Sequence, residues 1–308
     1  MKPCFANCAE FDDEDAATLS VSGEIAMSTD SFTVSPIAFP GGNIGTLAVA
    51  GTCNDLSMVA ARPKYLSCSF ILEEGLAFNT LKDIVSSMAS ELEKVGAKVV
   101  CGDTKVVAKG SVDKIFINTT GVGGVVRRGV SATALKQGDV VIVSRDIGCH
   151  GACILALREG LKLEHDIKSD CAVVWPAVSQ LLSSGIPIHA MRDATRGGLA
   201  SVFQEWCKTS EVQILLQEAD IPVSDPVRGV CELFGMEPFD LANEGTFVMA
   251  LPEQYAPIAI EILRTFNENA AIIGRVELAK PRLPVLSSET GAKRIMDFPV
   301  GELLPRIC

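Results

Sequence analysis

Four aspartates in short polar motifs are the first candidates for chemistry. They are Asp30 in STDSF, Asp55 in CNDLSM, Asp103 in GDTK and Asp193 in RDATRGG. We expect each at the end of a strand or the start of a helix. Mg²⁺ prefers oxygen ligands, commonly a few carboxylates with waters and substrate phosphates. A turn or helix-cap role explains any single aspartate equally well, so only the set of four indicates a metal site.

Glycines are the second group that could contact a ligand. No G-x-x-x-x-G-K-[ST] motif is present, and the GVGG run at Gly121–Gly124 does not complete G-x-G-x-x-G. Two glycine pairs, 41–42 and 197–198, precede predicted helices and could expose amide groups to an anion. Close packing or a turn explains these pairs equally well.

Histidine and cysteine spacing does not support a zinc centre. The chain has three histidines, His150, His165 and His189, and Cys149 and Cys153 flank the first of them. These two cysteines are one helical step apart, and no second C-x-x-C pair supplies the remaining ligands of a four-coordinate site. A G-x-S-x-G elbow for a serine nucleophile is also absent.

Cys308, the last residue, is the most unusual candidate. Pro299 and Pro305 prevent a helix in the residues that lead to it. We therefore expect an extended tail that carries a mobile thiol able to visit another active site. A chance terminal cysteine is the alternative interpretation.

Composition restricts the class of protein. The 308 residues carry a net charge of −11, which argues against nucleic acid or an anionic membrane surface as the main partner. No apolar run is long enough to span a bilayer, and the N-terminus lacks a basic, then apolar, signal. Eleven cysteines are too sparse for a disulfide scaffold. These features predict a cytoplasmic protein with reduced, mostly buried thiols.

Alternating strand and helix patterns predict layered α/β domains. We expect strands at Glu24–Phe32, Tyr65–Leu72, Ala97–Val100, Lys114–Thr119, Val140–Val143, Val212–Leu216 and Thr246–Ala250. We expect helices at Gly45–Ala60, Asn79–Val95, Gly151–Glu159, Ala172–Ser183, Gly198–Lys208, Val227–Leu233 and Glu253–Phe266. In the second helix, apolar residues recur at three- and four-residue steps, which predicts one buried stripe.

Turn signals suggest three segments. A strand (DVVIVS) ends near Ile147, and a glycine-containing turn then precedes a new helix. We therefore place an N-terminal domain at 1–147 and a C-terminal domain at 148–280. Residues 281–308, which begin at a proline-rich change in composition, would finish the second domain and form the tail.

Longer motifs resemble the family of hydrogenase maturation proteins HypE. They include STDSFTVSPIAFPGGNIGTLAVAGTCNDLSM, PKYLSCSFILEEGL, GDTKVV, SDCAVVWP, RDATRGGLASV, ANEGTFV and the terminal PRIC. The resemblance covers about Glu24 to Cys308. It implies a two-domain PurM-like α/β fold with an extended C-terminal tail, in which the N-terminal domain dimerises through its sheet.

The resemblance also implies a function. ATP and Mg²⁺ would be used to dehydrate a carbamoyl group on Cys308 to a thiocyanate, for the cyanide ligands of [NiFe]-hydrogenase. The carbamoyltransferase HypF and a HypC–HypD complex would be the partners. Lys105 and Glu244 would handle protons beside Cys308. ATP and metal would be bound by Asp30, Asn54, Asp55, Asp103, Asp193 and Gly197, the four aspartates being the metal ligands.

Two features depart from the family pattern. Family members usually carry a longer histidine- and glycine-rich leader before the STDSF motif, and we expect weaker ATP binding or turnover if that leader closes over the phosphates. Cys149 stands where the family often has aspartate, so a role for a carboxylate there does not transfer. The alternative functions are a selenophosphate-synthetase-type enzyme of the same fold and a non-catalytic cyano carrier.

Overall fold

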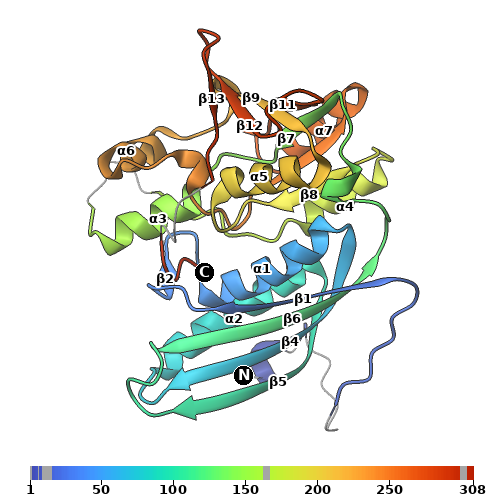
Figure 1. The fold of residues 1–308 in the computed structure, drawn as a ribbon. Helices are drawn as coiled ribbons and strands as arrows, with labels where there is room; N and C mark the ends of the chain where they lie inside the picture. The colour runs from blue at the N-terminus through green and yellow to red at the C-terminus, as the bar shows by residue number, and fades with distance from the viewer. Residues whose placement is uncertain (1, 6, 9–15, 162–166, 299–303) are drawn as a thin grey trace. The chain divides into compact units, whose positions relative to one another are not determined.

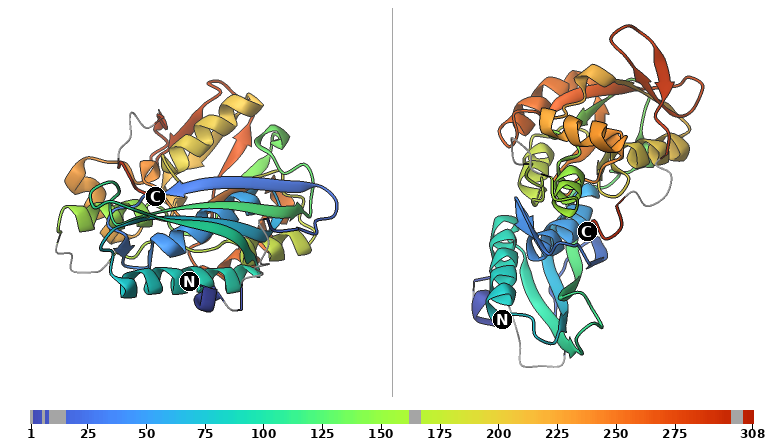
Figure 2. Two further views of the ribbon diagram at one scale, coloured as in Figure 1. Left: turned by 90° about the horizontal axis from the view of Figure 1, so that it is seen from below. Right: turned by 90° about the vertical axis from the view of Figure 1, so that its left-hand side faces the viewer.

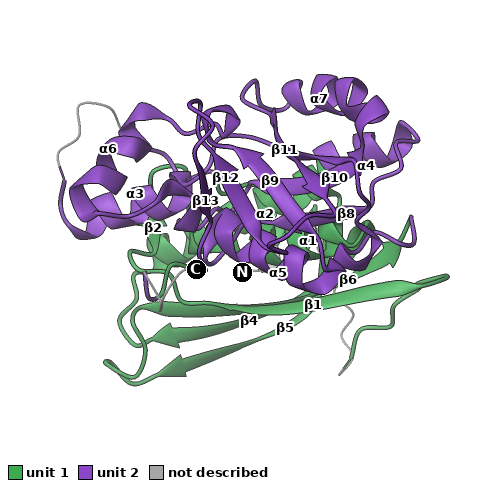
Figure 3. Ribbon diagram, turned by 45° about the horizontal axis from the view of Figure 1, so that its top comes forward, with its two compact units in different colours: residues 1–126, 171–176, 306–308 green, residues 127–170, 177–305 purple. Residues whose placement is uncertain are grey.

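The structure is a computed structural model that describes residues 2–5, 7–8, 16–161, 167–298 and 304–308. It divides into two compact units (Figures 1 and 3). Unit 1 comprises residues 1–126, 171–176 and 306–308, and unit 2 comprises residues 127–170 and 177–305. His165 and part of the predicted tail, residues 299–303, lie outside the described residues.

Unit 1 is built on a four-stranded sheet in the order β1-β6-β4-β5. The strands are β1 (Ile25–Phe32), β4 (Ala61–Glu73), β5 (Lys98–Val107) and β6 (Ile115–Val125). Only β4 and β5 are parallel. Helix α1 (Ile44–Met58) packs on the sheet and α2 (Phe78–Val95) packs on α1, with η1 (Lys2–Phe5) against α2 (Figure 2). The short hairpin β2 (Ala38–Phe39) and β3 (Gly42–Asn43) precedes α1.

The two helices of unit 1 differ in how they bury their side chains. Helix α1 is apolar or small around most of its circumference and is buried almost throughout, as expected for a helix between a sheet and a second helix. In α2 the predicted stripe is confirmed, because Ile84, Val85, Met88 and Leu92 are buried while the opposite face is exposed. The other face of the sheet is not covered by any helix of unit 1 (Figure 2).

Unit 2 contains a seven-stranded sheet in the order β13-β12-β9-β11-β7-β10-β8. Its strands are β7 (Asp139–Val143), β8 (Ala190–Asp193), β9 (Gln213–Gln217), β10 (Phe247–Pro252), β11 (Ala271–Glu277), β12 (Pro284–Ser287) and β13 (Lys293–Ile295). Its helices are α3 (Cys149–Arg158), α4 (Trp175–Ser183), α5 (Gly198–Ser210), α6 (Asp225–Phe234) and α7 (Ala256–Arg264), with short turns η2 (Ala132–Ala134), η3 (Glu218–Asp220), η4 (Pro238–Asp240) and η5 (Glu253–Tyr255). The residues 175–176 at the start of α4 belong to unit 1.

The core of unit 2 lies between its sheet and α5. Phe203 and Trp206 of α5 are almost fully buried, and their rings meet edge to face at 5.9 Å. They pack with Val141, Val248 and Ile214 from three strands of the sheet. Helix α7 packs on β7 and β11. The polar motifs lie at the end of this sheet where β8 ends and β10 begins.

The predicted domain boundary near residue 147 is wrong. The structure divides the chain between Val126 and Arg127 and assigns β7 to unit 2. There β7 pairs on one side with β10 and on the other with β11. The turn after β7 was a real signal, but it ends a central strand of the second sheet. Strands β7 and β10 pair although about a hundred residues of sequence separate them. A local turn pattern cannot show a pairing between such distant segments.

The predicted helices and strands all occur, with shifts at their ends. The strand expected at Ala97–Val100 continues through the GDTK motif to Val107. Strands β8, β11, β12 and β13 were not predicted, because they are short or contain charged residues. Among the described residues, no helix is both long and apolar enough to cross a membrane.

Candidate functional site

Asp30 and Asp55 lie together at the contact between β1 and α1. Ser28 and Asp30 are two residues apart on a strand and therefore share the face that meets α1. The Ser28 hydroxyl donates to Asp55 Oδ2 at 2.5 Å, and the Thr52 hydroxyl donates to Asp30 Oδ2 at 3.1 Å. Both carboxylates are half-buried. The predicted location at element ends is wrong here, since Asp30 lies within a strand and Asp55 within a helix.

A pair of threonines supports this carboxylate pair. The Thr52 and Thr119 hydroxyls are 2.7 Å apart, and Thr119 Oγ1 also donates to the Ala48 carbonyl at 2.9 Å. Both threonines are completely buried, so their hydroxyls need such partners. The sequence analysis did not identify either residue. The available signal was Thr52, which lies three positions before Asp55 and hence on the same side of α1.

Asn54 has a structural role in this chain. Its side-chain amide donates to the Ala172 carbonyl at 3.0 Å and accepts from the Val174 amide at 2.8 Å. The residue is 2% exposed. Both ends of the amide therefore hold residues 172–174 against α1, which is a different role from the predicted cofactor contact.

Asp103 and Lys105 form a separate site on the edge strand β5. Lys105 Nζ lies 2.6 Å from Asp103 Oδ2, and both side chains are exposed. The hydrogen bond from Lys105, with a smaller contribution from the Thr104 amide, lowers the pKa of Asp103. Lys105 is therefore an ion-pair partner in this structure, the cationic role that competes with a role as a base.

Within a single copy of the chain, Asp103 does not lie close to Asp30. Strand pairing aligns Asp30 with Thr119, then with Cys68, and then with Gly102, the neighbour of Asp103. Three strand spacings separate the two aspartates by about 14 Å. Because neighbours on a strand point to opposite faces, Asp103 and Lys105 face away from α1. No cluster of three metal-ligating side chains occurs in the described part of the chain.

Unit 2 brings the NEG motif and Asp193 to one end of its sheet. Asp193 ends β8 and pairs with Phe247 at the start of β10, and the Ala194 amide bonds the Thr246 carbonyl. Glu244, in the turn just before β10, is 3% exposed. The family resemblance gave these two carboxyl groups separate roles, Asp193 as a metal ligand and Glu244 in proton handling.

Asp170, which the sequence analysis overlooked, holds that turn. Its carboxylate accepts hydrogen bonds from the amides of Glu244 and Gly245 and from the Thr246 hydroxyl, at 2.7–3.1 Å. Asp170 is 2% exposed. A buried carboxylate with several donors is strongly held, so Asp170 fixes the backbone of Glu244. Asp170 is the second residue of the SDCAVVWP motif.

The two glycine pairs have different surroundings. At the start of α1, the Asn43 side chain already accepts from the Gly45 and Thr46 amides. This cap satisfies two of the amides that an anion would have used. Helix α5 instead starts at Gly197, a left-handed residue with no side-chain cap. Of the two helix starts, that of α5 has no side-chain cap, although the Gly198 amide donates to the Thr195 carbonyl.

The buried histidine and cysteines of unit 2 do not form a catalytic group. His150 Nδ1 lies 2.7 Å from the Ser169 hydroxyl, and His189 Nδ1 lies 2.8 Å from Asp139 Oδ2. Burial, reinforced by Asp170 and Asp146, raises the pKa of the Cys149 thiol. Cys149 is thus a protonated packing residue. None of the eleven cysteines, all of which lie in the described part of the chain, forms a disulfide, and eight are buried.

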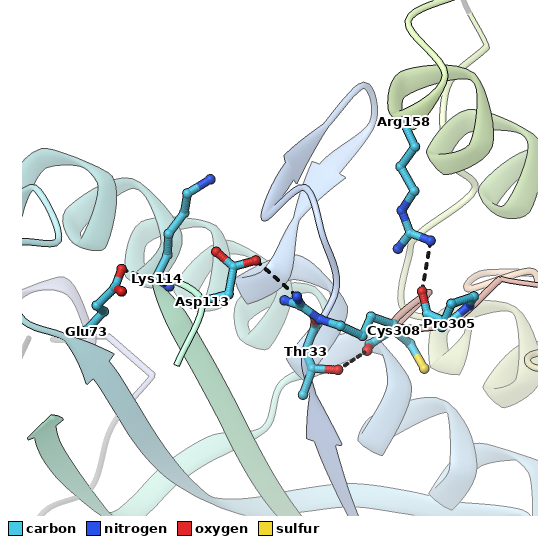
Figure 4. A network of polar contacts seen from close by, with 8 residues as sticks. Thr33, Glu73, Asp113, Lys114, Arg158, Pro305 and Cys308 are labelled. Carbon is cyan, nitrogen blue, oxygen red and sulfur yellow. Dashed lines mark hydrogen bonds and ion pairs between the residues drawn. The ribbon is translucent and has the colours of Figure 1, made fainter. Parts of the chain in front are cut away.

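The C-terminal residues are docked on unit 1. Both the amide and the hydroxyl of Thr33 donate to the Cys308 carbonyl oxygen, at 3.0 and 3.2 Å (Figure 4). The Ser35 amide bonds the Arg306 carbonyl at 3.3 Å, and Ile307 is 3% exposed. Thr33 is three residues beyond Asp30, or about 10 Å of extended chain. Cys308 itself is half-exposed.

Comparison with known proteins identifies a common family for both units. Residues 13–125 match the N-terminal domain of AIR synthase related proteins, and residues 136–282 match the C-terminal domain of the same proteins. Thiamine monophosphate kinase from Aquifex aeolicus shares the fold, with a TM-score of 0.67 at 19% identity over 92% of this chain and 93% of that one.

Closer relatives cover nearly the whole chain. Carbamoyl dehydratase HypE from Escherichia coli is 46% identical, over 99% of this chain and 92% of the relative. The Rhodobacter capsulatus protein of the same name is 42% identical, over 96% and 87%. A crystal structure of HypE in complex with ATP superposes with a TM-score of 0.93 at 42% identity, covering 99% of this chain and 92% of that one. A HypE–HypF complex gives 0.86 at 44% identity, covering 89% and 90%. The chain therefore belongs to the HypE family of carbamoyl dehydratases.

Proposed function

We propose that this protein uses ATP to dehydrate a carbamoyl group on its own Cys308, giving a thiocyanate for hydrogenase maturation. One observation carries the proposal: Cys308 is bound at Thr33, the residue directly after β1, which is the strand that carries Asp30. Unit 1 thus presents a carrier thiol close to a carboxylate pair of the kind that holds Mg²⁺ with a nucleotide. A relative in the HypE family is known in complex with ATP.

The chemistry explains why ATP is needed. The oxygen of a thiocarbamate leaves poorly as hydroxide but well as phosphate. Transfer of a phosphoryl group to that oxygen, followed by loss of phosphate and of both N–H protons, forms the S–C≡N group. Catalysis of such a transfer depends on positioning and on neutralising the phosphoryl charge.

The half-buried pair Asp30 and Asp55 fits a Mg²⁺–nucleotide complex. Mg²⁺ usually takes one or two carboxylates and completes its shell with waters and phosphates. Two aspartates held by the Thr52 and Ser28 hydroxyls provide that number. Asp193 as a metal ligand and Gly197, at the start of α5, as a nucleotide contact are proposals that rest on the motif resemblance.

Lys105 and Glu244 are the proposed proton-handling residues. Glu244 has a buried side chain on a backbone fixed by Asp170, which suits a group that must keep its position. Lys105 is paired with Asp103, so it would have to lose that partner before acting as a base. Its alternative role is to pair with phosphate as a cation.

The uncovered face of the unit 1 sheet supports a homodimer. Ile25, Met27 and Ile71 on this face are 54%, 69% and 40% exposed. Unpartnered apolar sheet faces mark interaction surfaces, and Asp103 and Lys105 lie on the same face. A second copy packed here would shield their ion pair from water. HypF as carbamoyl donor is supported by the HypE–HypF complex of relatives, whereas the HypC–HypD complex as acceptor follows from the family resemblance.

Intact-mass analysis tests the proposed reaction. The protein carbamoylated by a HypF-type transferase should lose the mass of one water after addition of ATP and Mg²⁺. The Cys308→Ala protein should bind ATP but acquire no modification. A carbamoylated protein that neither hydrolyses ATP nor loses water would favour the carrier interpretation. Turnover of ATP in Cys308→Ala at the wild-type rate would favour an enzyme of the selenophosphate-synthetase type.

Single substitutions test the two proton-handling residues. Lys105→Ala and Glu244→Ala should still accept the carbamoyl group, because the partner carries out that step, but should dehydrate it much more slowly. A reduction of 10²–10⁴-fold is typical for loss of a general acid or base. Lys98→Ala, on the same strand as Lys105, is the matched control. Dehydration at the wild-type rate in both variants would refute their assignment.

A further inference from the structure

Residues 108–114, which connect β5 to β6, form a loop with a fixed shape. Glu73 accepts from the Gly110 amide at 2.7 Å and from the Lys114 amide at 3.3 Å, and its own amide bonds the Lys114 carbonyl. Lys114 has a φ of 64°, a left-handed conformation that is uncommon for a residue with a side chain. Glu73 stabilises this conformation and thereby holds Asp113, which lies next to Lys114 at the β6 end of the loop (Figure 4).

Asp113 binds Arg306, two residues before the chain end. Arg306 Nη1 lies 3.0 Å from Asp113 Oδ2, and Arg306 Nε donates to the Thr33 carbonyl at 2.9 Å. The guanidinium carbon lies 5.6 Å from the centroid of the Phe116 ring, within the range of a cation–π contact. Three different kinds of contact therefore recognise one arginine.

The backbone of Arg306 is itself held in an uncommon conformation. Its φ is 53°, which costs about 1 kcal/mol or more for a residue that is not glycine. The contacts with Asp113, Thr33 and Phe116 offset this cost. A left-handed residue reverses the direction of the chain locally, and Ile307 is buried next to it.

The chain end is bound through hydrogen bonds that depend on register. Thr33 donates twice to the Cys308 carbonyl oxygen, and the Ser35 amide bonds the Arg306 carbonyl. A tail shifted by one residue would lose both bonds to Thr33 and would displace Arg306 from Asp113.

We propose that Asp113 and Thr33 are positioning residues that anchor Arg306 and Cys308 and so fix where the Cys308 sulfur lies. The role given to this anchor rests on the proposed function, because ATP-dependent dehydration needs the Cys308 sulfur in a fixed position. Asp113 binds the guanidinium group of Arg306, and Thr33 binds the carbonyl oxygen of Cys308. The ion pair between Arg306 and Asp113 is only half-buried, so water can compete for it and let the tail undock to visit a partner.

Amide hydrogen exchange measures the anchor without any need for activity. The Thr33 and Ser35 amides are bonded to the tail, so their exchange rates report the fraction of tail that is undocked. In Arg306→Ala we expect both rates to rise at least tenfold. In Asp113→Asn we expect a rise of about two- to fivefold, which corresponds to the loss of an exposed ion pair. The exchange of the Ile44 amide, bonded to the Ile37 carbonyl, should not change.

Two controls separate the anchor from general effects. Glu74→Gln removes an exposed carboxylate at the end of β4, beside Glu73, and should leave both amides as in the wild type. In the Arg306→Ala background, Asp113→Asn should have no further effect, because its partner has gone. Unchanged exchange of Thr33 and Ser35 in both Arg306→Ala and Asp113→Asn would overturn the proposal. So would equal effects of Asp113→Asn in the presence and absence of Arg306.

Single-turnover dehydration tests the purpose of the anchor. Fully carbamoylated Asp113→Asn should dehydrate more slowly than wild type at saturating ATP, and high salt should slow the wild type but not the variant. Asp113→Glu should recover part of the rate. Faster exchange at Thr33 combined with wild-type dehydration would overturn the positioning role. If the carbamoylated wild type does not dehydrate, the proposed function fails, while the exchange data still decide whether the anchor exists.

Discussion

At the scale of single residues, Asp30 and Asp55 differ in their setting from Asp103, another aspartate of unit 1. Asp30 and Asp55 each accept a hydrogen bond from a hydroxyl and remain half-exposed. These hydroxyls orient the two carboxylates. Asp103 differs, because Lys105 occupies one of its oxygens.

Asp55→Asn should weaken ATP binding only when Mg²⁺ is present. Loss of one charged ligand should cost about 3 kcal/mol, by analogy with other lost electrostatic contacts in active sites. Calorimetric titration with ATP, with Mg²⁺ and with a chelator, measures the difference. Asp83→Asn, an exposed aspartate on α2, is the control. Equal affinities of Asp55→Asn and wild type in Mg²⁺ would remove Asp55 from the site.

Asp240 gives unit 2 a pH-dependent stability. Burial, with repulsion from Glu237, raises the pKa of Asp240 to about 6, and Arg294 opposes the rise. A carboxyl group with a raised folded pKa contributes stability that is complete below its unfolded pKa. That contribution is lost as the pH rises through about 6.

Asp240→Asn should therefore stabilise the protein at pH 8 and have little effect at pH 4. A shift of about two units corresponds to about 3 kcal/mol, which half-exposure of the group reduces to about 1 kcal/mol. Thermal unfolding at the two pH values provides the measurement. Glu289→Gln, on the exposed turn between β12 and β13, should show no such dependence. The same stabilisation at both pH values would contradict the assignment to Asp240.

At the scale of elements, the start of α5 depends on a glycine. Gly198 has a φ of 55°, and a Cβ atom there would lie 2.3 Å from the Phe239 carbonyl oxygen and 2.6 Å from that of Leu241. The helix start is therefore packed against the backbone around η4. This close approach sets the position of α5 relative to Asp193 at the end of β8.

Gly198→Ala should lower the free energy of unfolding by about 3 kcal/mol or more, because backbone atoms must move to admit the methyl group. Gly229→Ala in α6 is the matched control, since a Cβ there meets no atom within 4 Å. That change should raise stability by about 0.5–1 kcal/mol, the usual gain from alanine in a helix. Denaturant titration compares the two. A Gly198→Ala protein as stable as wild type would show that η4 can move away.

At the scale of the whole molecule, the uncovered sheet face should determine the oligomeric state. The side chain of Met27 is 69% exposed on this face, on the edge strand β1. Met27→Asp would place a charge in an apolar contact, and burial of an unpaired charge is strongly unfavourable. We expect dissociation to a monomer, measured by sedimentation. Phe78→Asp, at the exposed start of α2, should leave the dimer intact. A Met27→Asp dimer of unchanged affinity would exclude this face.

Local sequence patterns identified most of the elements. Periodicity placed α2 and its buried stripe, and the proline-containing tail with its terminal thiol was apparent from residues 299–308. These features depend on neighbours within a few positions, which is the range that a pattern can report. The motif resemblance gave the family and the two-layer α/β fold, which the comparisons confirm.

Tertiary structure decided which of these residues meet. Strand order put Asp103 three strands away from Asp30 and on the opposite face, although both belong to motifs read as one metal set. In the folded chain, Asn54 forms hydrogen bonds with residues 172 and 174, and β7 belongs to the second sheet. Asp113 bonds Arg306, 193 positions later, to anchor the tail. Such contacts arise from the pairing and packing of distant segments, and no local spacing encodes them, because spacing reports only which residues share a face of one element.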